Sequence, residues 1–306
     1  MCVHLCAYSE IQEPPGPTVE YYRAEELQSP SDMATSVSFL PPKFVTDFLV
    51  DAFFTHAQAN YWYVERGWLT RTLGDIYEDP SSLCRRDVGA ICLIFMVLAI
   101  GTQYAYLESY AERLENSAHR RPGTHAGAFS EDALGVTLYQ QACRLVPDVI
   151  TVSSLESVQA CMLIGIYTLP LDASGLSYIY LNLAVKLAIQ NGMHRRYSGE
   201  GLDASVWETR NRVWWTVYTI ERYAEEILRV SLQNYESLWR SEELTDGIRR
   251  VGIFHGRPLS IPASDLDVDL PVDTADKWPS TTSSHTAQFL ATLRLNQMLS
   301  EMSHEM

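Results

Sequence analysis

The sequence predicts an all-α protein built from several packed helices. Apolar residues recur at steps of three and four along much of the chain, which is the spacing of an amphipathic helix. Glycine and proline separate these stretches, and no convincing strand alternation appears before residue 260. Hydrophobic residues make up 46% of the 306 positions and charged residues 20%, so the chain can bury a sizeable core.

The N-terminal residues 1–38 are predicted to be a flexible leader. They contain EPPGP and SPSD and little periodic apolar pattern. Order is expected to begin near Pro41, where two adjacent prolines precede a helical spacing. The apolar positions of this first helix are Phe44, Phe48, Leu49, Ala52 and Phe53.

A second helix is predicted from Asp87 to about Glu115. Its apolar run, Val88–Gly101, has 14 residues, whereas about 18 to 20 are needed to cross a bilayer. We therefore expect a helix buried inside the protein, and no membrane among its partners. The loop AHRRPGTHAGAF follows it.

Two helices are predicted in the middle of the chain. The first runs from about Ser130 to Leu145 and should stop before Pro147, because proline breaks the helical hydrogen-bond pattern. The second covers residues 153–169, where a serine and a glutamate three residues later, Ser153 and Glu156, have the spacing of a capping box.

A further helix is predicted from about Gly175 to Asn191. Ala184 and Ala188 are four residues apart on it, which lets another helix approach closely. Gly192 follows the last periodic residue and is expected to cap the helix at its C-terminus.

The stretch RNRVWWTVYTIERYAEE, residues 210–226, combines two tryptophans with many charges. Helical spacing joins Val213, Trp214, Val217, Tyr218 and Ala224. Glu208 and Arg212 form an i, i+4 pair, while Trp215 and Ile220 widen the apolar surface, so we expect this helix to be covered on two sides. The tryptophans could line a ligand pocket or a partner groove. We favour a core helix, in which each ring buries on the order of 200 Å².

Four segments, in order, carry a resemblance to a known family. LESVQACMLIGIYTL, LNLAVKLAIQNGMHRR, ETRNRVWWTVYTIERY and HGRPLSIPASDLDVDLP resemble the fungal-specific transcription factor domain, also called the xylanolytic activator regulatory domain. The resemblance covers about Leu40 to Pro271. The residues that carry its signature are Gly192, His194, Arg212, Trp214, Trp215, Glu221, Arg222, Gly256, Arg257 and Pro258. It implies an all-helical regulatory domain over residues 39–306.

Several features depart from the family pattern. The chain has no C-x2-C-x6-C cluster, with which family members bind zinc and read DNA. An insertion of about residues 227–252 separates Arg222 from Gly256. Leu228, Leu232, Tyr235 and Trp239 keep helical spacing there, so the insertion extends the helix or, alternatively, residues 230–250 are a retained intron. The last residues resemble the start of another family helix, so we expect a truncation at the C-terminus.

The resemblance implies a nuclear, non-enzymatic regulator of transcription. DNA would be reached indirectly, through a Zn2Cys6 cluster outside this chain, and zinc would enter only through that cluster. The formal net charge of −15 and the sequence pI of about 4.9 disfavour direct DNA binding. Expected partners are transcriptional co-regulators, a homo- or heterodimer partner, and a small-molecule inducer.

Two other functions remain open. The chain could be a free-standing modulator that dimerises with intact family members. It could also be an all-α enzyme resembling a terpene cyclase, although the sequence has no DDxxD motif for magnesium.

No motif predicts a catalytic, cofactor-binding or metal-binding residue. HExxH, GxSxG, GxxxxGK[ST] and GxGxxG do not occur. Asp265, Asp267 and Asp269 resemble the start of a calcium loop, but its sixth position is Leu270 and its twelfth is Asp276. Their alternation with leucine and valine favours an extended segment that packs one face.

The remaining charged and sulfur-containing residues have structural interpretations. His194, Arg195 and Arg196 follow a helix cap and are read as a solvated helix end. Arg222 and Arg257 are expected in a partly buried ionic network, a hypothesis that rests on the family order. The six scattered cysteines indicate reduced thiols rather than a disulfide framework.

Overall fold

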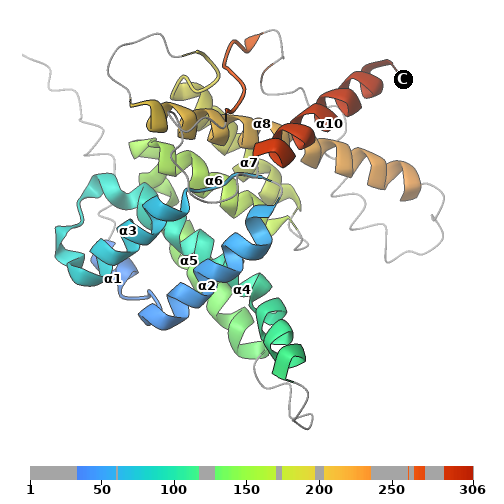
Figure 1. Cartoon of the computed structure of the whole chain (residues 1–306). Helices are drawn as coiled ribbons and strands as arrows, with labels where there is room; N and C mark the ends of the chain where they lie inside the picture. The colour runs from blue at the N-terminus through green and yellow to red at the C-terminus, as the bar shows by residue number, and fades with distance from the viewer. Residues whose placement is uncertain are drawn as a thin grey trace, which may run out of the picture.

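The described helices fold around one another (Figure 1). The computed structural model describes residues 33–59, 61–116, 128–169, 174–196, 203–235, 261, 265–272 and 286–305. Among these residues 81% are helical and none lies in a strand, which confirms the all-α prediction. The helices are α1 Met33–Val37, α2 Lys43–His56, α3 Arg66–Glu78, α4 Val88–Asn116, α5 Ala128–Val152, α6 Leu155–Thr168, α7 Ser174–Gln190, α8 Ala204–Tyr235 and α10 Thr286–Glu305. Single 3₁₀ turns lie at Ala57–Ala59, Pro80–Ser82 and Arg85–Asp87.

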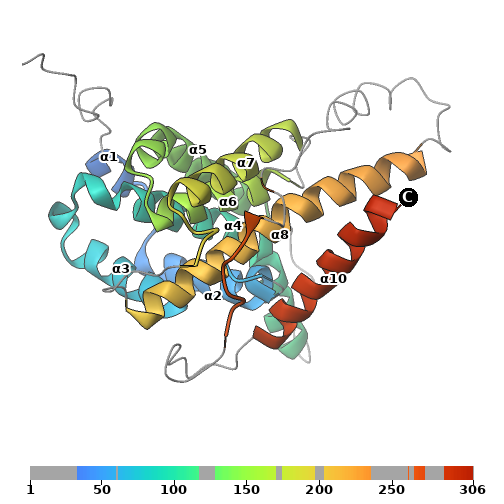
Figure 2. The same ribbon diagram turned by 90° about the horizontal axis from the view of Figure 1, so that it is seen from above.

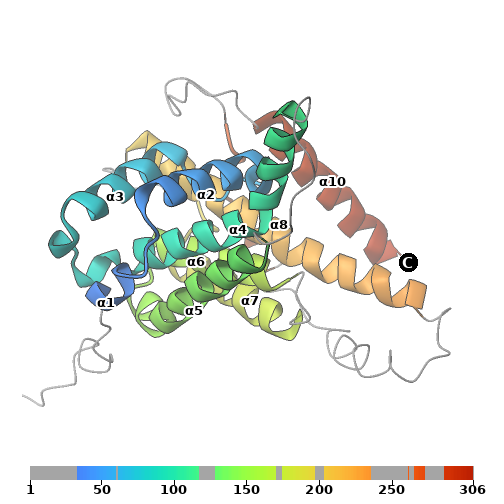
Figure 3. The same cartoon turned by 90° about the horizontal axis from the view of Figure 1, so that it is seen from below.

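Helix α4 is the centre of the core. It packs against α2 on one side and against α5 and α6 on the others (Figures 1 and 3). Every residue from Ile91 to Ile100 is buried. The segment Arg85–Ala105 is long and apolar enough to cross a membrane, more than the 14-residue run suggested, yet most of it is buried inside the protein. The prediction of a helix buried by protein is therefore confirmed.

Helix α6 lies between α4 and α7 and is buried on all sides from Ser157 to Gly165. Its cap is one residue later than predicted. Ser154 Oγ accepts a hydrogen bond from Ser157 N, and Ser157 Oγ accepts one from Ser154 N, at 3.2 and 3.1 Å. Ser153, the predicted cap, instead has φ of 48° and forms the turn between α5 and α6.

The helix predicted from about Ser130 to Leu145 does not stop before Pro147, so this predicted end is wrong. Helix α5 continues through this proline to Val152. Proline in a helix interior costs about 3 kcal/mol through the missing N–H and a clash with the preceding turn. Leu145 and Val149, on either side of Pro147, are fully buried, and burying one such side chain stabilises by about 1.5–3 kcal/mol. The tertiary packing of this last turn outweighs the local cost.

Helix α7 ends as predicted at Gly192, which has φ of +65°. Met193 N donates to Ala188 O at 3.0 Å and Gly192 N donates to Ile189 O at 2.9 Å, the paired bonds of a Schellman motif. The buried small residues Ala184 and Ala188 lie on this helix, which packs between α6 and α8.

The last two described helices of the chain are α8 and α10. The first part of α8 lies on α7, and α10 packs against α8 (Figure 2). In all three views α10 and the C-terminal half of α8 extend beyond the other helices. Helix α8 continues to Tyr235, so the start of the insertion at 227–252 is helical as its spacing predicts. Trp239 and the rest of the insertion lie outside the described residues, and the intron hypothesis stays a prediction.

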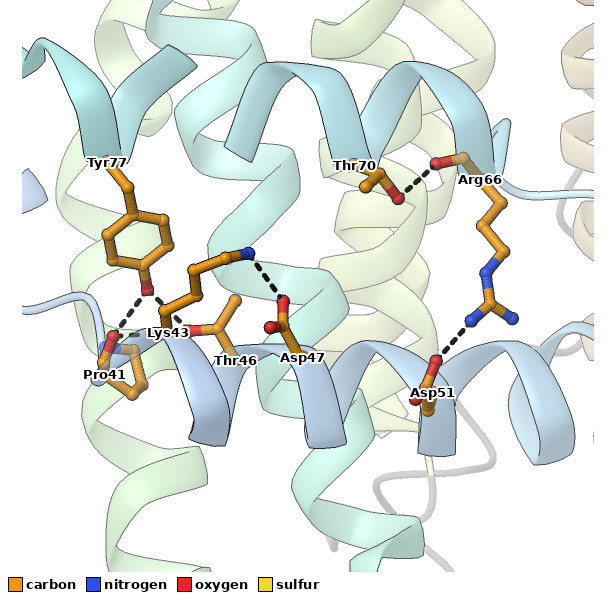
Figure 4. A network of polar contacts seen from close by, with 8 residues as sticks. All are labelled: Pro41, Lys43, Thr46, Asp47, Asp51, Arg66, Thr70 and Tyr77. Carbon is orange, nitrogen blue, oxygen red and sulfur yellow. Dashed lines mark hydrogen bonds and ion pairs between the residues drawn. The ribbon is translucent and has the colours of Figure 1, made fainter. Parts of the chain in front are cut away.

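Helices α2 and α3 pair through side chains along their length (Figure 4). Tyr77 OH donates to Pro41 O at 2.5 Å and lies 2.7 Å from Thr46 Oγ1, and burial raises the pKa of Tyr77. At the other end an ion pair joins Arg66 to Asp51. The sequence analysis did not predict α3, although its buried residues Leu69, Leu73 and Ile76 have helical spacing.

The N-terminal part differs from the prediction in two details. Order begins before Pro41, because α1 forms at Met33–Val37 and Val37 is buried. In α2 the predicted apolar stripe is only partly buried: Phe53 is enclosed, but Phe44 is 75% exposed. The leader residues 1–32 lie outside the described part of the chain.

Replacing Gly101 with alanine should destabilise the protein. A Cβ at this position of α4 would lie 2.4 Å from Leu49 O in α2, and a backbone atom cannot move aside as a side-chain tip can. We expect Gly101→Ala to lower the free energy of unfolding by about 1–3 kcal/mol in urea denaturation. The control is Gly74→Ala in α3, where a Cβ meets nothing within 4 Å, so helix propensity should raise stability by up to about 1 kcal/mol. Equal stability of the two variants would contradict the close crossing.

Candidate functional site

Of the family-signature residues, Gly192, His194, Arg212, Trp214 and Trp215 lie where the C-terminus of α7 approaches the first turns of α8. The cap at Gly192 turns the chain, so that Met193 enters the core and the two arginines after His194 reach the surface. Arg210 of α8 donates to Asn191 O at 2.6 Å, which fixes the capped end of α7 against α8. The site is thus placed by a helix end and one helix face.

A buried ion pair lies at the centre of this face. Arg212 Nε donates to Glu208 Oε1 at 2.8 Å, and both side chains are almost fully buried. The i, i+4 pair predicted from the sequence is therefore present, but it is not at the solvated edge of the helix. A buried ion pair is stable only when additional hydrogen bonds satisfy its remaining atoms.

Those additional bonds come from a distant segment, residues 265–272, which we call the acidic strap. Val272 N donates to Glu208 Oε1 at 3.0 Å, and Arg212 Nη2 donates to Val272 O at 2.9 Å. The pair thus holds both polar groups of one residue's backbone. Trp215 Nε1 donates to Asp269 O at 2.9 Å. The strap crosses α8 in Figure 2 and runs towards the N-terminus of that helix.

The acidic strap also contacts the arginines that follow α7. Arg196 N donates to Asp267 Oδ1 at 2.9 Å, and the Arg196 guanidinium pairs with Asp269. Arg195 lies 3.8 Å from Asp267. Both arginine side chains are more than half exposed, in agreement with the predicted solvated helix end, and their contacts with the strap were not predicted. About 70 positions separate these arginines from the aspartates, so no local sequence pattern predicts the contact.

The exposure of the strap explains its alternating sequence. From Asp265 to Val268 the residues alternate between exposed aspartates and more buried aliphatic residues, the period of an extended chain. Val268 and Pro271 are buried against the domain. The predicted packing of one face is confirmed, and two of the aspartates bind arginine. Across the described residues, no group of three or more His, Cys, Asp or Glu side chains could hold a metal ion.

The two tryptophans face different surroundings. Trp214 is completely buried in the core. Its ring is stacked 5.8 Å from Tyr218 and lies tilted 5.9 Å from His194. Trp215 meets the edge of Tyr218 at 5.6 Å and reaches the strap. The prediction that this helix is covered on two sides is confirmed. Burial and the neighbouring Arg195 lower the pKa of His194, against the opposing effect of Asp267.

The other predicted signature residues are only partly visible. Glu221 is buried on α8. The side chain of Arg222 and the residues Gly256, Arg257 and Pro258 lie outside the described part of the chain, so the hypothesis of an Arg222–Arg257 network stays a prediction. The sequence analysis missed Thr216, whose hydroxyl donates to Trp62 O at 2.8 Å and joins α8 to the loop before α3. No sequence signal identified that contact.

Three of the four described thiols lie on the helices and are at least half-buried, whereas Cys84 is exposed. Cys92 and Cys161 are buried and Cys143 is half-buried, all in the reduced form. Burial raises the pKa of Cys161 to about 12 and holds that of Cys92 well above its usual value. A thiol that stays protonated is a poor nucleophile and a poor metal ligand.

Removing one member of the buried ion pair should be costly. Arg212→Ala leaves the Glu208 carboxylate buried without its main counter-charge, so we expect unfolding free energy to fall by about 3–5 kcal/mol. The double variant Glu208→Met/Arg212→Met should lose less than the sum of the two single Met variants. Arg196→Ala breaks an exposed pair and should cost under about 1 kcal/mol. Urea denaturation followed by circular dichroism measures all of these, and an Arg212→Ala loss below 1 kcal/mol would refute a buried, strap-linked pair.

Comparisons with known proteins agree with the family resemblance that the residues at this site carry. The family model described as "Fungal specific transcription factor domain" matches residues 50–238. An uncharacterized transcriptional regulatory protein of Schizosaccharomyces pombe is 30% identical over 238 residues, 77% of this chain and 24% of that protein. The thiamine repressible genes regulatory protein thi1 of the same yeast is 28% identical over 186 residues, 61% of this chain and 22% of that protein.

A third relative, transcription factor FBD3 of Fusarium pseudograminearum, is 24% identical over 262 residues, 84% of this chain and 31% of that protein. The chain therefore spans between about a fifth and a third of the length of these relatives. No solved structure matches. With a family model covering more than half of its residues, and with all-helical packing around the tryptophan-bearing α8, the chain belongs to the fungal-specific transcription factor domain family.

Proposed function

We propose that this domain is the non-enzymatic regulatory part of a nuclear fungal transcription factor. It would restrain or permit activation, while a Zn2Cys6 cluster outside this chain reads DNA and binds zinc. Family membership supports this proposal, and the relatives are named as transcriptional regulators. Because the chain spans only part of those relatives, the activity of the whole protein is carried over as part of the proposal.

The charge of the domain supports a division of labour between two modules. A formal net charge of −15 repels the phosphate backbone, so DNA would be contacted by the cluster and not by this domain. The partners of the domain itself would then be transcriptional co-regulators, a second family member or a small-molecule inducer.

One observation carries the non-enzymatic part of the proposal. Three of the buried polar side chains on α8 bind the protein's own backbone: Glu208 and Arg212 bind Val272, and Thr216 binds Trp62. Groups used in this way hold the domain together and are not available to a substrate. The terpene-cyclase alternative gains no support, since it needs an aspartate-rich magnesium motif and the sequence has no DDxxD.

A reporter experiment tests the regulatory role. The chain is placed between an unrelated DNA-binding domain and a strong activation segment in a fungal host. We expect reporter output to differ from that of a control fusion carrying an unrelated helical protein of similar size, at equal protein levels. Fluorescence of a tagged fusion reports nuclear accumulation. Output equal to the control under all growth conditions would overturn the proposal.

A second candidate, a free-standing modulator that dimerises, draws support from α10. Leu295 and Met298 on this helix are 57% and 62% exposed, and α10 extends beyond the other helices together with the C-terminal half of α8 (Figure 2). Large exposed apolar side chains on a projecting helix are suited to a partner helix.

The dimer is testable with the purified chain. We expect light scattering coupled to gel filtration to give twice the 34.6 kDa chain mass, and Leu295→Glu/Met298→Glu to give the monomer, because two charges would have to enter an apolar contact. The matched control is Phe44→Glu on α2, which should leave the dimer intact. A monomeric wild-type chain at micromolar concentration would remove this candidate.

A further inference from the structure

We propose that the face formed by the C-terminal turn of α7 and the first turns of α8 is a binding site for an acidic, non-helical peptide. The acidic strap occupies this site within the chain. An acidic segment of another protein, with aspartates two residues apart followed by an aliphatic residue and proline, could take its place. This inference concerns a peptide partner and does not depend on the proposed role in transcription.

The first argument is the way in which the strap is recognised. Its three hydrogen bonds to α8 are all made by its backbone, at Asp269 O and at the N–H and C=O of Val272. Proteins that bind peptides use such main-chain bonds for affinity and reserve pockets and charges for specificity. The donors and acceptor on the domain side are Trp215, Arg212 and Glu208, all held rigidly on one helix.

The second argument is charge complementarity. Arg195 and Arg196 form a local positive edge on a domain whose overall charge is strongly negative. Both face aspartates of the strap, at spacing i and i+2. These arginines attract an acidic peptide to this edge, against the long-range repulsion from the net charge of −15.

The third argument is that much of the strap lies at the surface, while Val268 is its contribution to the hydrophobic core. Asp265, Asp267 and Leu270 are exposed, and the ion pairs to the arginines are exposed pairs that contribute little stability. Only Val268 and Pro271 of the strap are classed as buried. The departure of the strap would remove the bonds of Val272 from a buried ion pair, so an empty site is unfavourable. Exchange of one peptide for another is favoured over simple opening.

The test uses the full-length chain with its own strap weakened. In the variant Asp267→Asn/Asp269→Asn/Val272→Pro the strap loses the two charges that face Arg195 and Arg196, and the amide that donates to Glu208. The probe is a fluorescein-labelled peptide of residues 263–273, ASDLDVDLPVD. We expect it to bind the variant in fluorescence anisotropy, more tightly than it binds the wild-type chain, whose own strap competes.

Three controls make the result specific. A peptide with asparagine at positions 267 and 269 should bind about tenfold more weakly, as expected for the loss of two exposed ion pairs. Arg195→Gln/Arg196→Gln in the protein should weaken binding of the acidic peptide similarly but leave that of the asparagine peptide unchanged. Added salt should weaken binding of the acidic peptide more than that of the asparagine peptide, which keeps Asp265 and Asp273.

The indole N–H signal of Trp215 gives an independent readout. It should shift in the nuclear magnetic resonance spectrum when the strap is weakened, because the bond to Asp269 O is lost, and return towards its original position when peptide is added. The inference is overturned if the variant retains its helical circular dichroism and shows the shift but binds no peptide. It is equally overturned if the asparagine peptide or the arginine variant binds the same as its parent, or if the signal does not shift on weakening.

Discussion

The arrangement of α7, α8 and the acidic strap depends on one interaction, the buried ion pair of Glu208 and Arg212. Two charges removed from water are a liability unless every remaining atom finds a partner. Here two of these partners lie in a segment about 60 residues further along the chain, where the backbone N–H and C=O of Val272 bind Glu208 Oε1 and Arg212 Nη2. The pair therefore joins α8 to the acidic strap, and the strap in turn joins α8 to the end of α7.

The same principle recurs in the loop before α3, where side chains from helices bind the backbone of residues that lie outside helices. Gln159 on α6 donates to Tyr63 O at 2.6 Å, and Gln58 binds the backbone of Val64 through both its amide atoms. With no sheet among the described residues to satisfy the backbone of the connecting loops, long polar side chains from the helices do so. Such contacts link segments far apart in sequence, which gives the loops defined positions.

Much of the fold could be predicted from the sequence, because it rests on local patterns. Helical spacing, the glycine cap at Gly192 and the i, i+4 pair of Glu208 and Arg212 are all visible within a few residues. The errors arise where tertiary packing overrides a local rule. Pro147 should end a helix, but the buried side chains around it carry α5 onwards.

The site was predictable only in parts, for a related reason. Its arginines and its aspartates each form a recognisable short pattern, yet no periodicity shows that the two patterns meet. The burial of the ion pair was equally hidden, since charges at helical spacing usually lie at a solvated edge.

The apolar character of α4 has a consequence for the folding of the protein during its synthesis on the ribosome. The segment Arg85–Ala105 has the length and composition of a membrane anchor, and its cover comes largely from α5 and α6, which are synthesised later. Until about residue 168 has left the ribosome, α2 alone is available to cover this apolar segment of the nascent chain. Chaperones that hold hydrophobic nascent segments, and the pace of translation across the next 60 codons or so, therefore bear directly on the yield of folded protein.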